Sequence, residues 1–282
     1  MPASCIISNS WSLINKSSRL NLATKTLNWP LAADFTRTAR NRGGMSSQWS
    51  NNAISTKYGS SYYDHGILDD FDHRLEVEQL DKLIGGRREL VCLDLAAGNG
   101  RFTQAVFDRA ARVTAVDLEE KHVSHLAARF PAGKVQAVLA NAVAFLEDTT
   151  DQYDLIMTSG LLLFFDDATT TRLLENMKRR LKPGGLLFVR DFISHQGTVA
   201  LPSGVFAGVT LYYRPMPFYA AFGLEGFEVC RPLHHFPKLE AAVFRRLGFS
   251  IYRALWSRPM RTLSWTRIAY ANRIMVLKKT GA

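Results

Sequence analysis

The chain has 282 residues, of which 47% are hydrophobic and 21% are charged, as is ordinary for a folded globular protein. This length suits one α/β domain that carries extensions. No apolar run approaches the roughly 20 residues that a helix needs to cross a bilayer, so no transmembrane segment is predicted. The cysteines Cys5, Cys92 and Cys230 lie far apart without ligand spacing, which argues against a disulfide framework and a metal site and favours a reducing compartment. Cys92 and Cys230 lie in apolar runs and are expected to be small buried hydrophobes.

Positive charge is concentrated at the two ends of the chain, whose formal net charge is +10. Residues 231–282 contain 11 Lys and Arg against a single acid, Glu240. Residues 1–45 contain six basic residues against Asp34 alone, which leaves the middle of the chain mildly acidic. This asymmetry favours an anionic partner, such as nucleic acid, phospholipid or a phosphorylated substrate, although many basic surfaces are merely solvated.

Residues 1–45 are rich in Ser, Asn, Thr, Lys and Arg and show no sustained periodicity. We expect them to form a flexible basic extension, followed by one domain over residues 46–282. Three origins remain open for the extension: an organelle transit peptide, a flexible basic arm, or a region upstream of a true start at Met45. The expected location is cytoplasmic, or mitochondrial if the extension is a transit peptide.

Short apolar runs alternate with helical patterns through the middle of the chain. Helices are predicted at 69–84, 102–111, 120–130, 142–146 and 168–181. Strands are predicted at 90–95, 113–116, 135–139, 153–158, 186–191 and 226–230. This alternation predicts a doubly wound α/β fold, with a mostly parallel sheet and helices on both faces. On such a sheet, ligands bind beyond the carboxyl ends of the strands.

The first strand runs into a glycine turn, Leu93–Gly100, with the sequence LDLAAGNG. Glycines let the backbone approach a ligand, and the next helix points its amino end at the same place. Thr103 stands where a dinucleotide fingerprint has its third glycine, and Asp94 would repel a diphosphate. Asp117, after the second strand, can accept both hydroxyls of a ribose, and Asn141, after the third, can pair with an adenine edge. The pattern therefore favours a cationic amino-acid nucleoside over a dinucleotide.

Taken together, these motifs resemble the class I S-adenosylmethionine-dependent methyltransferase family. The resemblance also includes the fourth strand, YDLIMTS, and the approach to the fifth, LKPGGLLF, and it covers about Tyr58–Lys279. It implies a Rossmann-like methyltransferase fold with a seven-stranded sheet, whose last strand, at 273–278, runs antiparallel. It also implies S-adenosyl-L-methionine as the cofactor. The implied cofactor-binding residues are Tyr58, Asp94, Ala96, Gly98, Gly100, Asp117, Leu118, Asn141, Ala142 and Ser159.

Tyr58 has an alternative role, and Asn141 and the glycine turn depart from the usual family sequence. Tyr58 is expected to close over the methionine moiety, or else to pack against a helix. Asn141 stands where the family usually has aspartate. The turn reads Ala-Ala-Gly-Asn-Gly where the family usually has Gly-Cys-Gly or Gly-Ala-Gly. Two glycines of the turn are retained, and an amide can serve either edge of adenine, so the cofactor prediction stands.

The sulfonium methyl group is already activated, so an amine or carboxylate acceptor needs no acid–base pair. A hydroxyl or an acidic carbon would need a base, for which position suggests Asp191, His195 or Tyr213, each with a structural role as the alternative. The run Ser159–Phe165 lacks the Asn/Asp-Pro-Pro-Tyr/Phe motif of one group of nucleic-acid methyltransferases. It is expected to be a packed helical turn.

A connection of about forty residues separates the last two predicted strands, which indicates an insertion at about 232–272. Helical spacing gives it an apolar side with Leu239, Val243, Leu247, Ile251 and Leu255, and a basic aromatic side with Lys238, Arg245, Arg246, Phe249, Arg253 and Trp256. The basic side suits a membrane surface, a lipid-linked substrate or RNA, whereas a partly buried helix with solvated arginines is the structural alternative.

The favoured function is methyl transfer to a small or lipid-linked metabolite. One alternative is an RNA methyltransferase that uses the basic carboxyl-terminal region. The other is a catalytically inactive adaptor that binds nucleic acid or a membrane.

Overall fold

The computed structural model describes residues 66–194, 197–203, 208–227, 242, 245–248, 251 and 270–279. The helices of this part are α3 (Gly66–Ile84), α4 (Arg101–Val106), α5 (Glu120–Arg129), α6 (Ala142–Asp148), the 3-10 helix η3 (Leu162–Phe164), α7 (Asp167–Arg180) and α8 (Met216–Ala220). The strands are β1 (Leu90–Leu95), β2 (Ala110–Asp117), β3 (Val135–Leu139), β4 (Tyr153–Ser159), β5 (Leu181–Ser194), β6 (Val199–Pro202), β7 (Thr210–Pro215), β8 (Glu225–Phe227) and β9 (Tyr270–Lys278).

The strands of the described part form one mixed sheet with the order β3-β2-β1-β4-β5-β7-β6. Strands β1 to β5 run parallel to one another. Strand β9 runs antiparallel along β5, and β8 pairs with the far edge of β9. The winding reverses at β1, which has β2 on one side and β4 on the other. The predicted doubly wound α/β class is confirmed, and the antiparallel direction of the last strand is confirmed with it.

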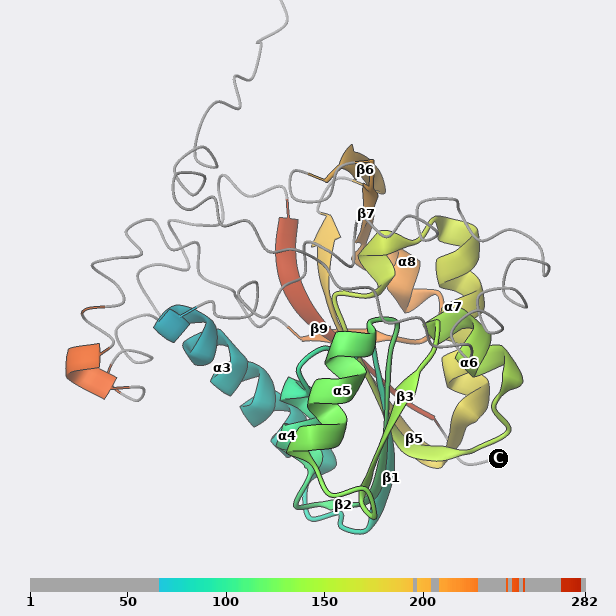
Figure 1. Cartoon of the computed structure of the whole chain (residues 1–282). Coiled ribbons are helices and arrows are strands. Elements are labelled where there is room, and N and C mark those ends of the chain that lie inside the picture. The colour runs from blue at the N-terminus through green and yellow to red at the C-terminus, as the bar shows by residue number, and fades with distance from the viewer. Residues whose placement is uncertain are drawn as a thin grey trace, which may run out of the picture. The chain divides into compact units, whose positions relative to one another are not determined.

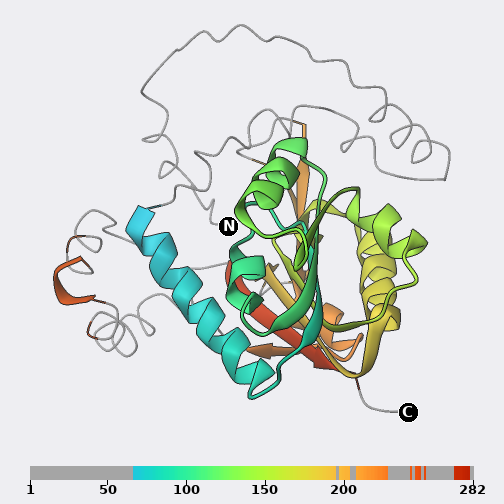
Figure 2. The same ribbon diagram turned by 60° about the horizontal axis from the view of Figure 1, so that its bottom comes forward.

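Helices cover both faces of the sheet, with α3, α4 and α5 on one side and α6, α7 and α8 on the other (Figures 1 and 2). Two apolar cores fill the layers between helices and sheet. Successive residues of β1 belong to different cores. Cys92 packs in the core beneath α3–α5, and Leu93 packs in the core beneath α6 and α7. Both are completely buried, as expected for a strand covered on two faces. The prediction for Cys92 as a buried hydrophobe is thereby confirmed.

The helix after the glycine turn is shorter than predicted, because α4 ends at Val106 and β2 already begins at Ala110. The backbone N–H of Leu90 donates to the carbonyl of Arg109 at 3.1 Å, and Leu90 pairs with Ala110 in the sheet. Pairing with β1 thus overrides the helical pattern of these residues, a common outcome when local preference and sheet formation compete. The other predicted helices and strands of this region differ from the structure by a few residues at their ends.

Strands β6 and β7 and helix α8 were not predicted, so the sheet exceeds the expected seven strands. Strand β5 continues past the end of β4, and its last residues, Ile193 and Ser194, pair with β7. Strand β7 in turn forms an antiparallel hairpin with β6. The extension 1–45 and most of the predicted insertion lie outside the described residues. Among the described helices, none is long and apolar enough to cross a membrane.

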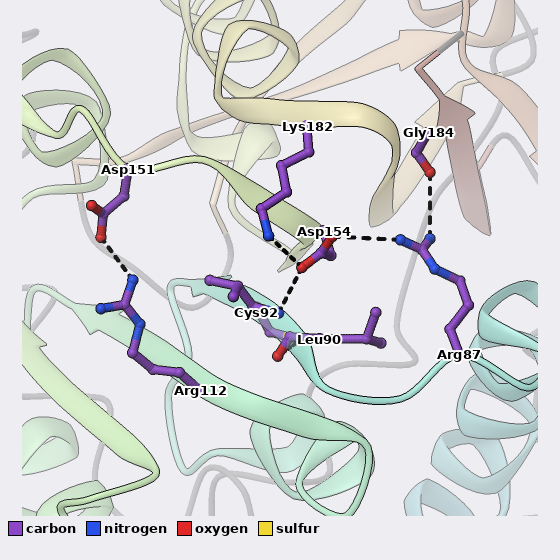
Figure 3. A network of polar contacts seen from close by, with 9 residues as sticks. Arg87, Leu90, Cys92, Arg112, Asp151, Asp154, Lys182 and Gly184 are labelled. Atoms are coloured by element: carbon purple, nitrogen blue, oxygen red, sulfur yellow. Dashed lines mark hydrogen bonds and ion pairs between the residues drawn. The ribbon is translucent and has the colours of Figure 1, made fainter. Parts of the chain in front are cut away.

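A polar network joins the starts of β1, β4 and β5 at the amino-terminal edge of the sheet (Figure 3). The carboxylate of Asp154 accepts hydrogen bonds from the backbone N–H of Val91 at 2.9 Å and from Lys182 Nζ at 2.8 Å. Arg87 Nη2 lies 3.7 Å from its other oxygen. Burial raises the pKa of Asp154, but the bonds from Lys182 and Val91 outweigh burial, and the net shift is downward. This network lies at the edge opposite to the predicted ligand site.

Candidate functional site

The predicted ligand-binding residues gather at the carboxyl-terminal edge of the sheet. Asp94 lies in β1 just before the glycine turn, Asp117 ends β2, Asn141 follows β3 and Ser159 ends β4. These strands are parallel neighbours, so their ends meet at one edge. The structure therefore brings together the predicted residues of four strand ends. Tyr58 lies outside the described residues.

The glycine turn has a left-handed backbone at three positions, with φ of 58° at Ala96, 53° at Gly98 and 76° at Gly100. Glycine is needed at position 100 for a second reason. A Cβ there would lie 2.6 Å from Leu126 Cδ2 and 2.9 Å from Phe130 Cε2 of the adjoining helix and loop. The turn thus packs closely against α5 on one side. On its other side, a ligand can approach the backbone.

Asp117 holds the turn from the end of β2. Its Oδ2 accepts the backbone N–H of Gly98 at 2.8 Å, whereas its Oδ1 accepts the backbone N–H of Glu119 at 2.9 Å and lies 3.1 Å from His122 Nδ1. A carboxylate offers about four acceptor positions, so these three contacts leave one, on Oδ2. In this geometry Oδ2 is the oxygen that can receive a ribose hydroxyl, and the binding of both hydroxyls by Asp117 stays a prediction.

Asp94 lies beneath the turn and is almost completely buried, with 2% of its surface exposed. Burial raises the pKa of its carboxyl to about 6, although a hydrogen bond from Thr103 Oγ1 at 2.7 Å works against the rise. The nearby charge of Asp117 adds to the increase. Two acidic groups at a glycine turn disfavour a diphosphate and favour a cationic ligand.

The predicted adenine position combines an amide with apolar surface. Asn141 is the N-cap of α6, where its Oδ1 accepts the backbone N–H groups of Val143 at 2.9 Å and Ala144 at 3.4 Å. Because the oxygen is used by the cap, the amide nitrogen is the group left to a ligand. Leu118 and Leu139 follow on the neighbouring strand ends and are 44% and 42% exposed, which provides apolar surface for a flat base. Ala142 lies buried at the start of α6.

The three candidates for a general base lie in different settings. Asp191 is completely buried and accepts the backbone N–H groups of Leu163 at 3.1 Å and Phe192 at 2.8 Å. Burial raises the pKa of Asp191 to about 6. These contacts tie Asp191 to η3 and indicate an anchoring role. Tyr213 lies half-buried in β7, and His195 lies outside the described residues.

A buried arginine, Arg214 of β7, was missed by the sequence reasoning. Its guanidinium donates to Asp167 Oδ1 at 2.7 Å, to the carbonyl of Leu162 at 3.0 Å and to the carbonyl of Phe165. Together with Asp191 it clamps the loop after β4, which contains the packed helical turn expected from the sequence. An arginine within an aromatic run is the one signal that could have identified it.

Helix α5 supports the whole turn, and this role was also missed. Its inner positions His122 and Leu126 and the following Phe130 are buried and four residues apart, and they contact Asp117 or approach Gly100. Arg129 Nη1 donates to the carbonyl of Asn99 at 2.9 Å. The spacing of four residues could have indicated one buried helix face.

The fold is the Rossmann-like methyltransferase fold that the sequence resemblance implies. Residues 92–185 match the family model described as the methyltransferase domain. Phosphoethanolamine N-methyltransferase of Triticum aestivum is 34% identical over 108 residues, which cover 37% of this chain and 21% of the wheat protein. The maize protein phosphoethanolamine N-methyltransferase 1 (Zea mays) is 30% identical over 112 residues, again 21% of its length. Residues 92–185 are thus similar to a methyltransferase domain, and the chain spans about a fifth of the length of these curated relatives.

Solved structures share the fold at low sequence identity. The 1,6-didemethyltoxoflavin-N1-methyltransferase of Burkholderia thailandensis, with bound 1,6-didemethyltoxoflavin and S-adenosylhomocysteine, superposes with a TM-score of 0.55 at 18% identity. That match covers 92% of this chain and 93% of the other. The [4+2]-cyclase SpnF matches with a TM-score of 0.51 at 17% identity, over 74% of this chain and 82% of its own. A cyclase among the matches means that the fold alone does not define the reaction.

Proposed function

We propose that this protein binds S-adenosyl-L-methionine at the glycine turn and transfers its methyl group to a small-molecule acceptor. The observation that carries the proposal is the contact between Asp117 at the end of β2 and the backbone of Gly98 in the turn. This contact brings the acid proposed to bind ribose next to the backbone proposed to face the ligand. The match of residues 92–185 to the methyltransferase domain supports the same activity.

The residues of the site fit the parts of this cofactor. The remaining acceptor position on Asp117 suits a ribose hydroxyl, and the exposed Leu118 and Leu139 suit the faces of adenine. The amide nitrogen of Asn141 can donate to a ring nitrogen of the base. When bound, the cofactor supplies a methyl group activated by a positively charged sulfur. The buried acid Asp94 adds negative charge beneath the turn, and the protein's part is to align the acceptor and exclude water.

For the acceptor we favour a small or lipid-linked metabolite, and phosphoethanolamine is the first to test because the wheat and maize relatives carry it in their names. A primary amine needs no base beyond its own free form, which agrees with the anchored state of Asp191. The loop clamped by Arg214 and Asp191 follows β4 and is the part of the described chain best placed to border the acceptor.

Calorimetric titration tests the cofactor assignment. We expect the protein to bind S-adenosyl-L-methionine and S-adenosylhomocysteine but not NADH. Asp117→Ala should weaken the binding of both by about 1–3 kcal/mol, because it removes a charged hydrogen-bond acceptor. Asp151→Ala, which changes an exposed acid at the opposite edge, serves as the matched control and should leave affinity unchanged. A folded wild-type protein that binds neither ligand would contradict the proposal.

Transfer of labelled methyl to phosphoethanolamine, to phospholipid vesicles and to total RNA distinguishes the acceptor classes. Label in a water-soluble small molecule supports the proposal, and label in lipid supports its lipid-linked form. Label in RNA would establish the RNA alternative, and salt-sensitive RNA binding should then accompany it. Cofactor binding without transfer to any cellular extract would favour the inactive adaptor.

A further inference from the structure

Behind the ribose-binding acid lies a histidine to which the proposed function gives no role. His122 is in the first turns of α5 and is 4% exposed, and its Nδ1 lies 3.1 Å from Asp117 Oδ1. The same oxygen accepts the backbone N–H of Glu119 at 2.9 Å, so the two donors approach one oxygen from the helix side. The other oxygen faces the glycine turn through Gly98.

We infer that His122 is a positioning residue for the cofactor site, because it holds the Asp117 carboxylate with Oδ2 turned toward the ribose. This inference rests on the proposed function. An ionised carboxylate only accepts hydrogen bonds, so Nδ1 carries the proton and donates. A second donor on Oδ1 opposes rotation of the carboxylate about its Cβ–Cγ bond. Oδ1 is thereby reserved for the protein, and Oδ2 is reserved for the turn and the ligand.

The position of His122 suits this role better than simple packing does. It shares the buried face of α5 with Leu126, and Leu126 lies against the turn at Gly100. An apolar side chain would fill the same space, yet here an imidazole is directed at the carboxylate. The exposed His125 lies on the outer side of the same helix and provides a control with the same chemistry.

A ligand-dissection experiment separates positioning from packing. S-adenosylhomocysteine and its 2′,3′-dideoxy analogue are titrated into the wild type, His122→Leu, His122→Asn and the control His125→Leu. Asparagine places an amide nitrogen near the position of Nδ1, whereas leucine fills space without a donor. We expect His122→Leu to weaken S-adenosylhomocysteine binding about 10-fold or more, and His122→Asn to recover most of the loss. For the dideoxy analogue, His122→Leu should change affinity by less than about twofold.

Each other outcome overturns the inference. Equal losses for both ligands in His122→Leu would show a packing role, and unchanged affinity for S-adenosylhomocysteine would show no role at the site. If the wild type binds S-adenosylhomocysteine normally in these cases, the proposed function still stands. If the folded wild type binds neither ligand, the proposed function fails and the inference fails with it. Should His122→Leu not fold, His122→Met makes the same comparison.

Discussion

At the scale of single residues, the glycine turn combines backbone conformation with close packing. Gly100 has a left-handed φ of 76° and touches α5 so closely that a Cβ would lie 2.6 Å from Leu126. Gly85, at the end of α3, has a similar φ of 61°, but a Cβ there meets nothing within 4 Å. The two glycines therefore share the conformational requirement and differ in the packing requirement.

Gly100→Ala should destabilise the protein more than Gly85→Ala does. Left-handed backbone costs an alanine about 1–2 kcal/mol at both positions, and overpacking adds about 1–3 kcal/mol at Gly100. Urea unfolding of the two variants measures the difference directly. Gly100→Ala should also weaken cofactor binding, since the turn must move away from α5, whereas Gly85→Ala should not. Equal losses of stability would show that α5 yields to the new methyl group.

The residues that the sequence could identify are those whose role depends on backbone position. Asp94 and Asp117 lie at the ends of apolar strands, and Gly98 and Gly100 follow the first of them, so their placement at one sheet edge could be predicted. The supporting side chains could not be found this way. His122 and Arg214 act through contacts between segments distant in the chain or across a helix turn, and burial decides whether such a side chain is a partner or a solvated charge.

At the scale of elements, α3 is joined to β5 by a largely buried ion pair. Arg190 Nε donates to Glu76 Oε1 at 2.9 Å, and His73 Nδ1 lies 3.6 Å from the other oxygen. Burial raises the pKa of Glu76, but the charge of Arg190, the nearby His73 and the hydrogen bond from Arg190 outweigh it, and the pKa falls to about 2. Because the folded-state pKa lies below the usual value of 4.5, the pair stabilises the fold above that pH and loses its effect as the pH falls toward 2.

Glu76→Gln should therefore lower the free energy of unfolding near pH 7 by about 1–3 kcal/mol. The difference from the wild type should shrink as the pH falls from 4.5 toward 2, where the wild-type carboxyl also becomes neutral. Urea unfolding of both proteins at several pH values checks this. The difference between variant and wild type is the quantity to compare, because other groups also make stability depend on pH. The raised pKa values of Asp94 and Asp191, each about 6, change stability with pH in the opposite direction to Glu76. Stability from those two groups is complete below the usual value of 3.8 and declines as the pH rises through 6.

Asp81→Asn on the same helix is the control for Glu76→Gln. Asp81 pairs with Arg109 at 3.2 Å, but its side chain is 43% exposed, so its removal should cost less than about 1 kcal/mol. A pH-independent difference for Glu76→Gln would mean that its charge does not contribute to the contact between α3 and β5.

The elements that the sequence predicted well are the parallel strands and the helices between them, because each has a buried face and a clear end. The β6–β7 hairpin could not be predicted, since it depends on β5 continuing beyond β4 to expose two residues for pairing. The early end of α4 also depends on strand pairing. Because Leu90 pairs with Ala110 in the sheet, the helix ends before Ala110, and the sequence of α4 alone does not show this.

At the scale of the whole described domain, the two edges of the sheet carry different tasks. The carboxyl-terminal edge holds the glycine turn, the buried acids Asp94 and Asp117, and the exposed Leu118 and Leu139 of the proposed adenine position. Burial of these acids costs stability. The amino-terminal edge holds ion pairs that join strand starts, with Asp154 at the centre of the network in Figure 3. This division predicts that stability and cofactor affinity can be changed separately.

Asp154→Ala should lower the free energy of unfolding by about 1–3 kcal/mol, because it leaves the part-buried N–H of Val91 and the ammonium of Lys182 without their acceptor. Asp151→Ala removes a neighbouring acid that pairs with Arg112, but both side chains are about half exposed, and the expected loss is less than about 1 kcal/mol. Urea unfolding gives the two stabilities, and titration with S-adenosylhomocysteine gives the affinities. Both variants should bind as the wild type does below their unfolding transitions. A loss of affinity in Asp154→Ala would mean that strain at one edge of β1 and β4 reaches the glycine turn at the other, and that the two edges act as one unit.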